Sequence, residues 1–271
     1  MRLLFLGDVV GRSGREAVLR HVPELIRALR IDVVVINGEN AAGGYGIHDK
    51  LAQEFYAAGV DAITLGNHTW DQRELISTID QDPRLLRPVN FPESTPGRGA
   101  VLLTDRRGRK VLVIALLARL FMDAHDDPFG AIEKVLRGHR LGGSVEAIVV
   151  DFHGEATSEK MAMGHFLDGR VSLVVGTHSH IPTADAQILP HGTAYITDAG
   201  MCGDYDSVIG MRKEVSVARF SRRLPTEKMV PAEGEATVCG VFVETDDKTG
   251  LARHLAPVRI GGRLQPAMPE L

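Results

Sequence analysis

The chain reads Val33-Val34-Val35-Ile36-Asn37-Gly38-Glu39-Asn40, an apolar run that ends in a glycine, a carboxylate and a side-chain amide. A short apolar run bounded by glycine is typical of a buried strand. In open α/β sheets, ligands bind in the crevice beyond the carboxyl ends of the strands. The polar end of this run therefore predicts a functional site at the edge of a sheet.

Four other apolar runs end in the same way, with side chains that can bind a metal ion. They close at Gly7-Asp8, Gly66-Asn67-His68, Asp151-Phe152-His153 and Gly176-Thr177-His178-Ser179-His180. Taken alone, a turn aspartate is more often a helix cap, and a lone histidine is more often packed or solvated. Five strand ends with the same chemistry favour a shared site, and together they supply enough ligands for two metal ions.

Strand and helix patterns alternate through the first two-thirds of the chain. The apolar runs predict strands at Leu3–Leu6, Val33–Ile36, Ala62–Leu65, Val111–Leu117, Ala147–Val150 and Leu173–Val175. Amphipathic patterns predict helices at Arg15–Arg30, Lys50–Ala58, Gln72–Ile79, Phe129–His139 and Glu159–Leu167. The later part is β-rich, with strands expected at Ala194–Ile196, Ala236–Glu244 and Ala252–Ile260.

This alternation predicts an α/β fold with mainly parallel pairing in the early strands. Two sheets with helices outside, a four-layer sandwich, would fit the pattern, and a single mixed sheet would fit it too. The chain has no internal repeat or linker that would divide it, so we expect one domain over residues 1–271.

The composition is that of a globular protein, with 44% hydrophobic and 24% charged residues among 271. A formal net charge of −4 gives no electrostatic reason to expect a long nucleic acid or an anionic membrane as partner. The two cysteines are too few for a disulfide framework, and Leu3–Leu6 is too short for a signal peptide. We therefore expect a soluble cytoplasmic protein that acts on small molecules, with a homo-oligomer left open.

The candidate ligands mix imidazole nitrogen with carboxylate and amide oxygen, and they include no thiolate. This mixture suits iron, manganese, zinc or cobalt, and it does not suit a closed structural zinc site. Two such ions about 3.5–4 Å apart can hold both the attacking and the leaving oxygen of a phosphate ester. One carboxylate must then bridge the two ions, and Glu39 is the natural choice.

The ordered motifs GD, GEN, GNHTWD, DFHGEATSEK and GTHSHIPTAD resemble the calcineurin-like metallophosphoesterase superfamily. Within it they closely resemble the YmdB-like phosphodiesterase family. Most superfamily members begin with Asp-x-His, whereas this chain has Asp8-Val9-Val10, and it has Gly38-Glu39-Asn40 in place of a second Gly-Asp motif. Both departures match the YmdB-like branch. One small departure from that branch is Gly154, where an alanine is expected.

The resemblance implies a four-layer α-β-β-α sandwich and a di-iron or related two-metal site. It also implies hydrolysis of phosphodiesters, notably 2′,3′-cyclic nucleotides, by a hydroxide that bridges the metals. One metal would be held by Asp8, Glu39, Asn40 and His180. The other would be held by Glu39, Asn67, His153 and His178. His68 would be the general acid.

Two other functions stay open: a phosphomonoesterase or nucleotidase on the same metals, and a non-catalytic metal- or nucleotide-binding regulator. Asp71 is either a partner that orients His68 or a solvated turn residue. Asp198 and Asp204 are candidates for supporting the metal ligands. The basic run Arg106-Arg107-Gly108-Arg109-Lys110 is interpreted as a solvated hairpin rather than a nucleic-acid patch.

Overall fold

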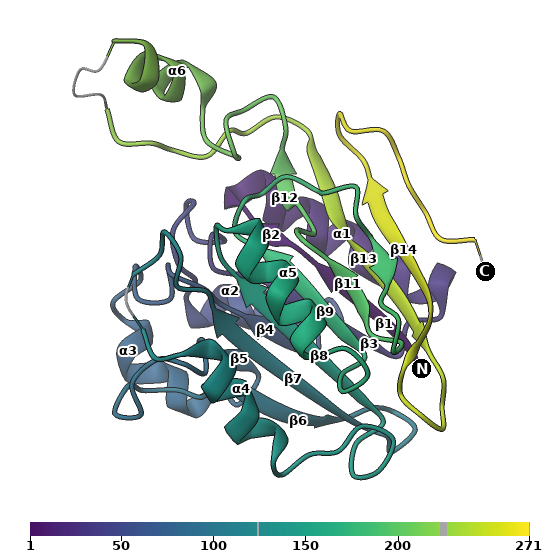
Figure 1. Cartoon of the computed structure of the whole chain (residues 1–271). Coiled ribbons are helices and arrows are strands. Elements are labelled where there is room, and N and C mark those ends of the chain that lie inside the picture. Colours follow the sequence, from purple (N-terminus) through teal and green to yellow (C-terminus); the bar gives the residue numbers. More distant parts are fainter. Residues whose placement is uncertain (124, 223–226, 271) are drawn as a thin grey trace.

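The computed structural model describes residues 1–123, 125–222 and 227–270, and within them the strands form two sheets (Figure 1). The first sheet has eight strands, and β14 (Ala252–Ile260) pairs with β13 beside the main path. Along that path the order is β2 (Asp8–Val9), β12 (Met201–Asp204), β13 (Ala236–Thr245), β1 (Arg2–Leu6), β3 (Val33–Asn37), β4 (Ala62–Thr64) and β5 (Leu85–Leu86).

The second sheet has six strands in the described part of the chain. Their order is β10 (Gln187–Ile188), β11 (Ala194–Ile196), β9 (Leu173–Thr177), β8 (Ala147–His153), β7 (Lys110–Leu117) and β6 (Ala100–Thr104). β6 and β7 pair antiparallel around the basic run, so the predicted hairpin is confirmed.

Pairing is parallel through the strands that bear the predicted site. β1, β3, β4 and β5 pair parallel in the first sheet, and β7, β8, β9 and β11 do so in the second. Parallel neighbours end at the same edge of a sheet, so the polar strand ends gather there. The later strands do not form a separate sheet: β13 and β14 join the first sheet antiparallel, and β11 joins the second.

The two sheets share a hydrophobic core. Successive strand residues point to opposite faces, so Leu3 and Phe5 pack toward the second sheet, where they meet Val113 and Val149. Leu4 faces the other way, into a core made with the helices of the outer layer. The prediction of a mixed α/β protein with two sheets is confirmed.

Helices cover the outer face of each sheet. α1 (Gly11–Leu29) and α2 (Asp49–Ala57) contribute to the core on the outer face of the first sheet. α4 (Pro128–Leu136) and α5 (Thr157–Phe166) contribute to the core on the outer face of the second. None of the helices in the described residues is both long and apolar enough to cross a lipid bilayer.

Two regions differ from the sequence-based expectation. α6 (Lys213–Arg222) stands away from the body (Figure 1), in a part of the chain predicted as β-rich. Ser216 is its buried residue, so it lacks the apolar stripe that marks a packed helix. The helix expected at Gln72–Ile79 is shorter: α3 spans Leu75–Thr78, and the 3-10 turn η1 follows at Ile79–Gln81.

Candidate metal centre

The predicted ligands stand at the carboxyl ends of strands from both sheets. Asp8 opens β2 directly after β1, Glu39 follows β3, and Asn67 follows β4. From the second sheet, His153 ends β8 and His178 follows β9. Because the sheets pack face to face, these strand ends meet along one edge of the two-sheet body.

His153 lies at the centre of this cluster and contacts three other predicted ligands. Its Nε2 lies 2.9 Å from Glu39 Oε1, 2.9 Å from Asn67 Oδ1 and 3.1 Å from His178 Nδ1. The ligating atoms of Glu39, His153 and His178 all lie within 4.8 Å of one another, close enough to hold a single ion. Four of the predicted side chains are thus brought together around one point.

A second group of candidate metal ligands includes Asp8. Its Oδ2 accepts a hydrogen bond from the backbone N–H of His178 at 3.1 Å, and its Oδ1 lies 3.8 Å from His180 Nε2. Among the described residues, Asp8 Oδ1 and Asn40 Oδ1 are both buried without a hydrogen-bond partner. The amide nitrogen of Asn40 donates to the Gly44 carbonyl at 3.0 Å, which fixes the amide and leaves its oxygen free. Buried, unpaired oxygens of this kind fit a cation.

Each of the three imidazoles has one nitrogen engaged on the side away from the cluster. His180 Nδ1 lies 2.8 Å from the Ile209 carbonyl oxygen, and His178 Nε2 lies 3.2 Å from Glu155 Oε2. A carbonyl oxygen can only accept, so His180 Nδ1 carries a proton, and the Nε2 of the same ring faces Asp8 Oδ1 at 3.8 Å. Metal-ligating histidines are commonly held in this way through the ring nitrogen that faces away from the metal.

His153 is oriented by residues that the sequence analysis did not assign. The Thr177 hydroxyl donates its single proton to Asp151 Oδ1 at 2.6 Å, so at 2.9 Å it can only accept from His153 Nδ1. Asp151 also accepts from Thr64 Oγ1 at 2.6 Å. Asp151 and His153 are two residues apart in one strand, so they share a face, and that spacing was the available sequence signal.

Burial and charge together set the protonation of the cluster. Burial acts to raise the pKa of Glu39, but the neighbouring histidines outweigh it and hold that pKa at about 2. Burial acts to lower the pKa of His153, but Glu39 and other carboxylates raise it to about 9. Burial and the charge of His153 lower the pKa of His178 to about 3. His153 thus holds a proton beside the ionised Glu39 at the point where the predicted ligands converge, and a bound metal ion would take the place of that proton.

Two glycines allow the close approach of these side chains. A Cβ on Gly66 would lie 2.5 Å from Glu39 Oε2 and 2.3 Å from His153 Cδ2. A Cβ on Gly176 would lie 2.7 Å from the carbonyl carbon of Thr197, so the strand end before His178 also needs a glycine. The loop that follows is strained as well, because His178 and His180 have φ values of 96° and 65°. Non-glycine residues rarely adopt such angles, and they persist where surrounding contacts impose them.

His68 lies at the rim and is held on two sides. Its backbone N–H donates to Glu39 Oε2 at 3.1 Å, and its Nδ1 lies 2.8 Å from Asp71 Oδ2. The Tyr45 ring packs edge-to-face against the imidazole, with ring centroids 5.2 Å apart. Asp71 therefore orients His68 instead of being only a solvated turn residue, and His68 Nε2 is left for another partner.

The two other aspartates singled out by sequence lie in different places. Asp198 is buried and accepts from the backbone N–H of Ser179 at 3.0 Å, so it supports the loop between two predicted ligands. Asp204 accepts from Gly234 N at 2.9 Å and from Asp206 N at 2.7 Å. Asp204 thus holds a turn at the end of β12 and makes no bond to a ligand among these contacts.

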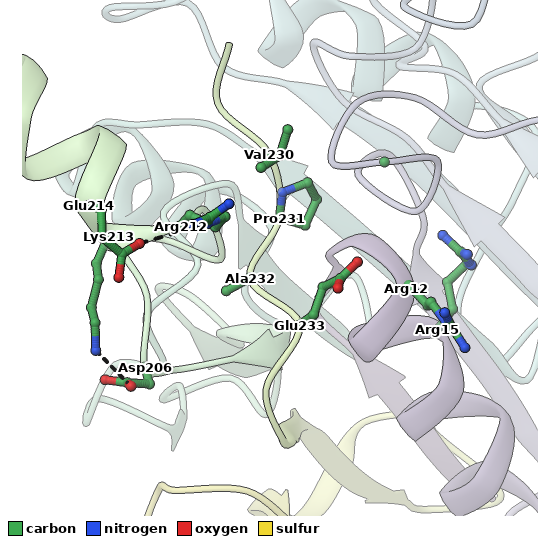
Figure 2. A pocket seen from close by; sticks show the side chains of 11 residues that line it. Arg12, Arg15, Asp206, Arg212, Lys213, Glu214, Val230, Pro231, Ala232 and Glu233 are labelled. Atoms are coloured by element: carbon green, nitrogen blue, oxygen red, sulfur yellow. Dashed lines mark hydrogen bonds and ion pairs between the residues drawn. The ribbon is translucent and has the colours of Figure 1, made fainter. Parts of the chain in front are cut away.

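A hollow of about 740 Å³ lies beside the start of α1, and its lining contains none of the predicted ligands. Figure 2 shows Arg12 projecting from α1 on one side and Lys213 paired with Asp206 on the other. The Lys213–Asp206 distance is 2.7 Å, and Arg12 pairs with Glu16 at 2.7 Å. Because none of the predicted ligands lines this hollow, we assign the chemistry to the histidine–carboxylate cluster.

The fold and the cluster together define a mixed α/β protein with a buried histidine–carboxylate group suited to metal ions. The model of the YmdB-like protein family matches residues 4–258. The chain belongs to the YmdB-like family.

Relatives match over nearly the whole chain. A 2′,3′-cyclic-nucleotide 2′-phosphodiesterase of Bacillus subtilis (strain 168) is 47% identical over 96% of this chain and 97% of its own. The crystal structure of a hypothetical protein from Thermus thermophilus superposes with a TM-score of 0.89 at 40% identity, covering 97% of this chain and 100% of that one. The crystal structure of a novel phosphatase from Mycoplasma pneumoniae gives 0.87 at 33% identity, covering 96% and 93%.

Proposed function

We propose that this protein is a dinuclear-metal phosphodiesterase that hydrolyses 2′,3′-cyclic nucleotides, with His68 as the general acid. We propose iron as the native metal, with manganese, zinc or cobalt as alternatives, in one domain built as the four-layer α-β-β-α sandwich of the calcineurin-like type. The three hydrophobic cores, one between the sheets and one under each helical layer, support that architecture. The name of the Bacillus subtilis relative supports the substrate.

The observation that carries the metal site is the convergence of Glu39, His153 and His178, whose ligating atoms lie within 4.8 Å of one another. His153 Nδ1 and His180 Nδ1 contact oxygens outside the cluster, so the Nε2 of each ring is turned toward the other predicted ligands. Glu39 Oε1 lies 2.9 Å from His153 Nε2, and in this proposal Glu39 is the carboxylate shared by both ions. The unpaired Asp8 Oδ1 and Asn40 Oδ1 complete a donor set of nitrogen and oxygen that fits iron or manganese. In this assignment Asp8, Glu39, Asn40 and His180 hold one ion, and Glu39, Asn67, His153 and His178 hold the other.

Two bound ions would polarise the phosphate and activate the attacking water. The protein's own part in the reaction is to supply a proton to the departing ribose oxygen, which is a poor leaving group. The contact of His68 Nδ1 with Asp71 Oδ2 at 2.8 Å supports this role, because it orients the ring and would leave Nε2 to face the substrate. A positioned acid of this kind contributes about 10²- to 10⁴-fold in rate.

An assay of three substrates tests the proposal. Protein loaded with iron or manganese is given 2′,3′-cyclic AMP, 3′,5′-cyclic AMP and a nucleoside 5′-monophosphate. We expect 2′,3′-cyclic AMP to be hydrolysed fastest, and we expect the activity to disappear after chelation and to return with metal. Protein proved metal-free by elemental analysis that keeps its rate would contradict the two-metal mechanism.

The same assay separates the alternatives. A phosphomonoesterase would prefer the nucleoside monophosphate, and a regulator would bind metal and hydrolyse none of the three. The phosphomonoesterase needs cations near a dianionic phosphate. Lys160 lies within one ligand motif, but its ammonium group is buried and bonded to Asp198 at 3.0 Å, so it is not available to substrate.

A further inference from the structure

A hollow of about 560 Å³ opens directly beside His68. Asp71, which bonds His68 Nδ1, is one of its lining residues. Tyr45 lines it too, and the edge of the Tyr45–His68 ring pair therefore forms the border between the hollow and the metal centre. Its volume lies within the range of small-ligand pockets, about 300–1,000 Å³.

The walls of this hollow are aromatic and fixed in place. Trp70 is half-buried against the core under α1 and α2, and its ring packs at 6.5 Å from that of Phe91. Gln72 Nε2 donates to the Tyr45 carbonyl at 2.7 Å, which ties the two loops of the hollow together. A Cβ on Gly46, whose φ is +73°, would lie 2.8 Å from Gln72 Cγ, so the loops also pack closely. A preformed aromatic wall loses little freedom when a flat ligand binds.

The chemistry of the proposed reaction indicates which part of the substrate lies next to His68 and the hollow. A general acid must lie next to the oxygen that departs, and in a 2′,3′-cyclic nucleotide that oxygen belongs to the ribose that bears the base. His68 contacts the predicted ligand Glu39 through its backbone N–H, and its ring contacts Tyr45 and Asp71, which line the hollow. A ribose whose oxygen reaches the His68 ring would therefore bring its base to the hollow.

We propose that this hollow binds the nucleoside part of the substrate, with the base stacked against Tyr45. The assignment rests on the proposed function, since it takes His68 as the acid. Stacking of bases on aromatic side chains is a common mode of nucleotide recognition and depends little on base identity. Arg73 and Lys228 also line the hollow, and Lys228 Nζ lies 5.8 Å from the Tyr45 ring centroid, so the wall is cationic as well as aromatic.

The chain offers a direct probe of this site, because Trp70 is its single tryptophan and lines the hollow. Metal-loaded protein is titrated with adenosine 3′-monophosphate, the product of opening the 2′,3′-cyclic ester at its 2′-oxygen, and an assay for released phosphate checks that the nucleotide is not consumed. Inorganic phosphate is the control ligand, because it can bind the metals but carries no base. We expect the nucleotide to change the Trp70 fluorescence and phosphate to leave it unchanged. An equal response to both ligands, or none to the nucleotide at saturation, would overturn the assignment.

Substitution of Tyr45 tests the stacking itself. Tyr45→Ala should raise the Kd for adenosine 3′-monophosphate about tenfold to a hundredfold, the usual effect of removing a stacking partner. Tyr45→Phe keeps the ring and should restore most of the affinity. If the alanine variant binds the nucleotide as tightly as the parent protein, Tyr45 is not a stacking partner and the proposal fails.

Kinetics separate this proposal from the proposed reaction. The second substrate is the 2′,3′-cyclic phosphate of methyl riboside, which has the same scissile bond and no base. Tyr45→Ala should raise KM for 2′,3′-cyclic AMP at least tenfold more than for the methyl riboside. An equal fall in kcat on both substrates would mean that Tyr45 acts by positioning His68, and it would overturn the base site. Protein that hydrolyses neither substrate but still shows the Tyr45-dependent fluorescence response would keep the nucleoside site and contradict the phosphodiesterase.

Discussion

Lys160 Nζ lies 3.0 Å from Asp198 Oδ2, and both side chains are buried. The same ammonium group donates to the Thr177 carbonyl at 2.7 Å, and the same carboxylate oxygen accepts from Ser179 N at 3.0 Å and Ser179 Oγ at 2.7 Å. The ion pair therefore holds both sides of the strained loop that carries two predicted metal ligands. Removing one partner leaves a buried charge without compensation.

Lys160→Met removes the ammonium group and keeps most of the apolar stem. We expect the free energy of unfolding to fall by about 3–5 kcal/mol, because Asp198 is then buried and unpaired. Urea denaturation with a chelator present measures this without a contribution from metal binding. Lys213→Met is the matched control, because its pair with Asp206 is about half exposed and should contribute far less to the free energy of unfolding. Equal losses in the two variants would show that the buried pair has no special structural role.

The strand ends of the site could be predicted from the sequence, because burial and polarity change there within a few residues. Glu39 and Asn67 each follow an apolar run, and His153 closes one, so the local pattern alone marks them. Parallel pairing then brings such ends to one edge. Assignment of each ligand to a particular ion came from the resemblance and stays a prediction, as does a homo-oligomer.

The supporting contacts could not be predicted, because they depend on which strands are neighbours and in what register. Thr177 reaches His153 since these two residues are Cα partners in the parallel pair of β8 and β9. Lys160 and Asp198 are 38 residues apart, and nothing in either local sequence indicates the other. Similarly, the sequence pattern of residues 236–244 predicts that β13 is a strand, but it does not predict that this strand lies between β12 and β1 in the sheet.

Substitution of His68 should separate a proton donor from a metal ligand. His68→Ala is expected to keep two metals per chain and to lose about 10²- to 10⁴-fold in kcat on 2′,3′-cyclic AMP. The deficit should shrink with a p-nitrophenyl leaving group, which scarcely needs a proton. His178→Ala is the comparison, and it should lose metal and activity together. An equal deficit for His68→Ala on both substrates would rule out the general-acid role.

Asn40 should contribute to one metal and not the other. Val10 stands at the position of the histidine in the Asp-x-His motif of the superfamily that this sequence resembles, and it is buried and has no lone pair to bind a metal. Asn40 Oδ1 is a buried oxygen without a hydrogen-bond partner in the described residues, which suits it to fill that role. Asn40→Ala should therefore hold close to one metal per chain at limiting supply, whereas Asn40→Asp should hold two. Two tightly bound ions in Asn40→Ala, measured by elemental analysis, would show that its oxygen is not a ligand.

Gly154 departs from the expected family motif for a steric reason. A Cβ at this position would lie 2.2 Å from the Cβ of Ala118, at the paired end of the neighbouring strand. Gly154→Ala should therefore lower the free energy of unfolding by about 1–3 kcal/mol, the usual effect of overpacking a tight contact. Ala118→Gly should recover most of this loss in the double variant, so urea denaturation of all four forms should show a coupling of at least about 0.5 kcal/mol. Gly138→Ala is the control, because its nearest atom would lie 4.0 Å away and the change should stay within about 0.5 kcal/mol. Additive effects of the two substitutions would mean that Ala118 is not what requires glycine at this position.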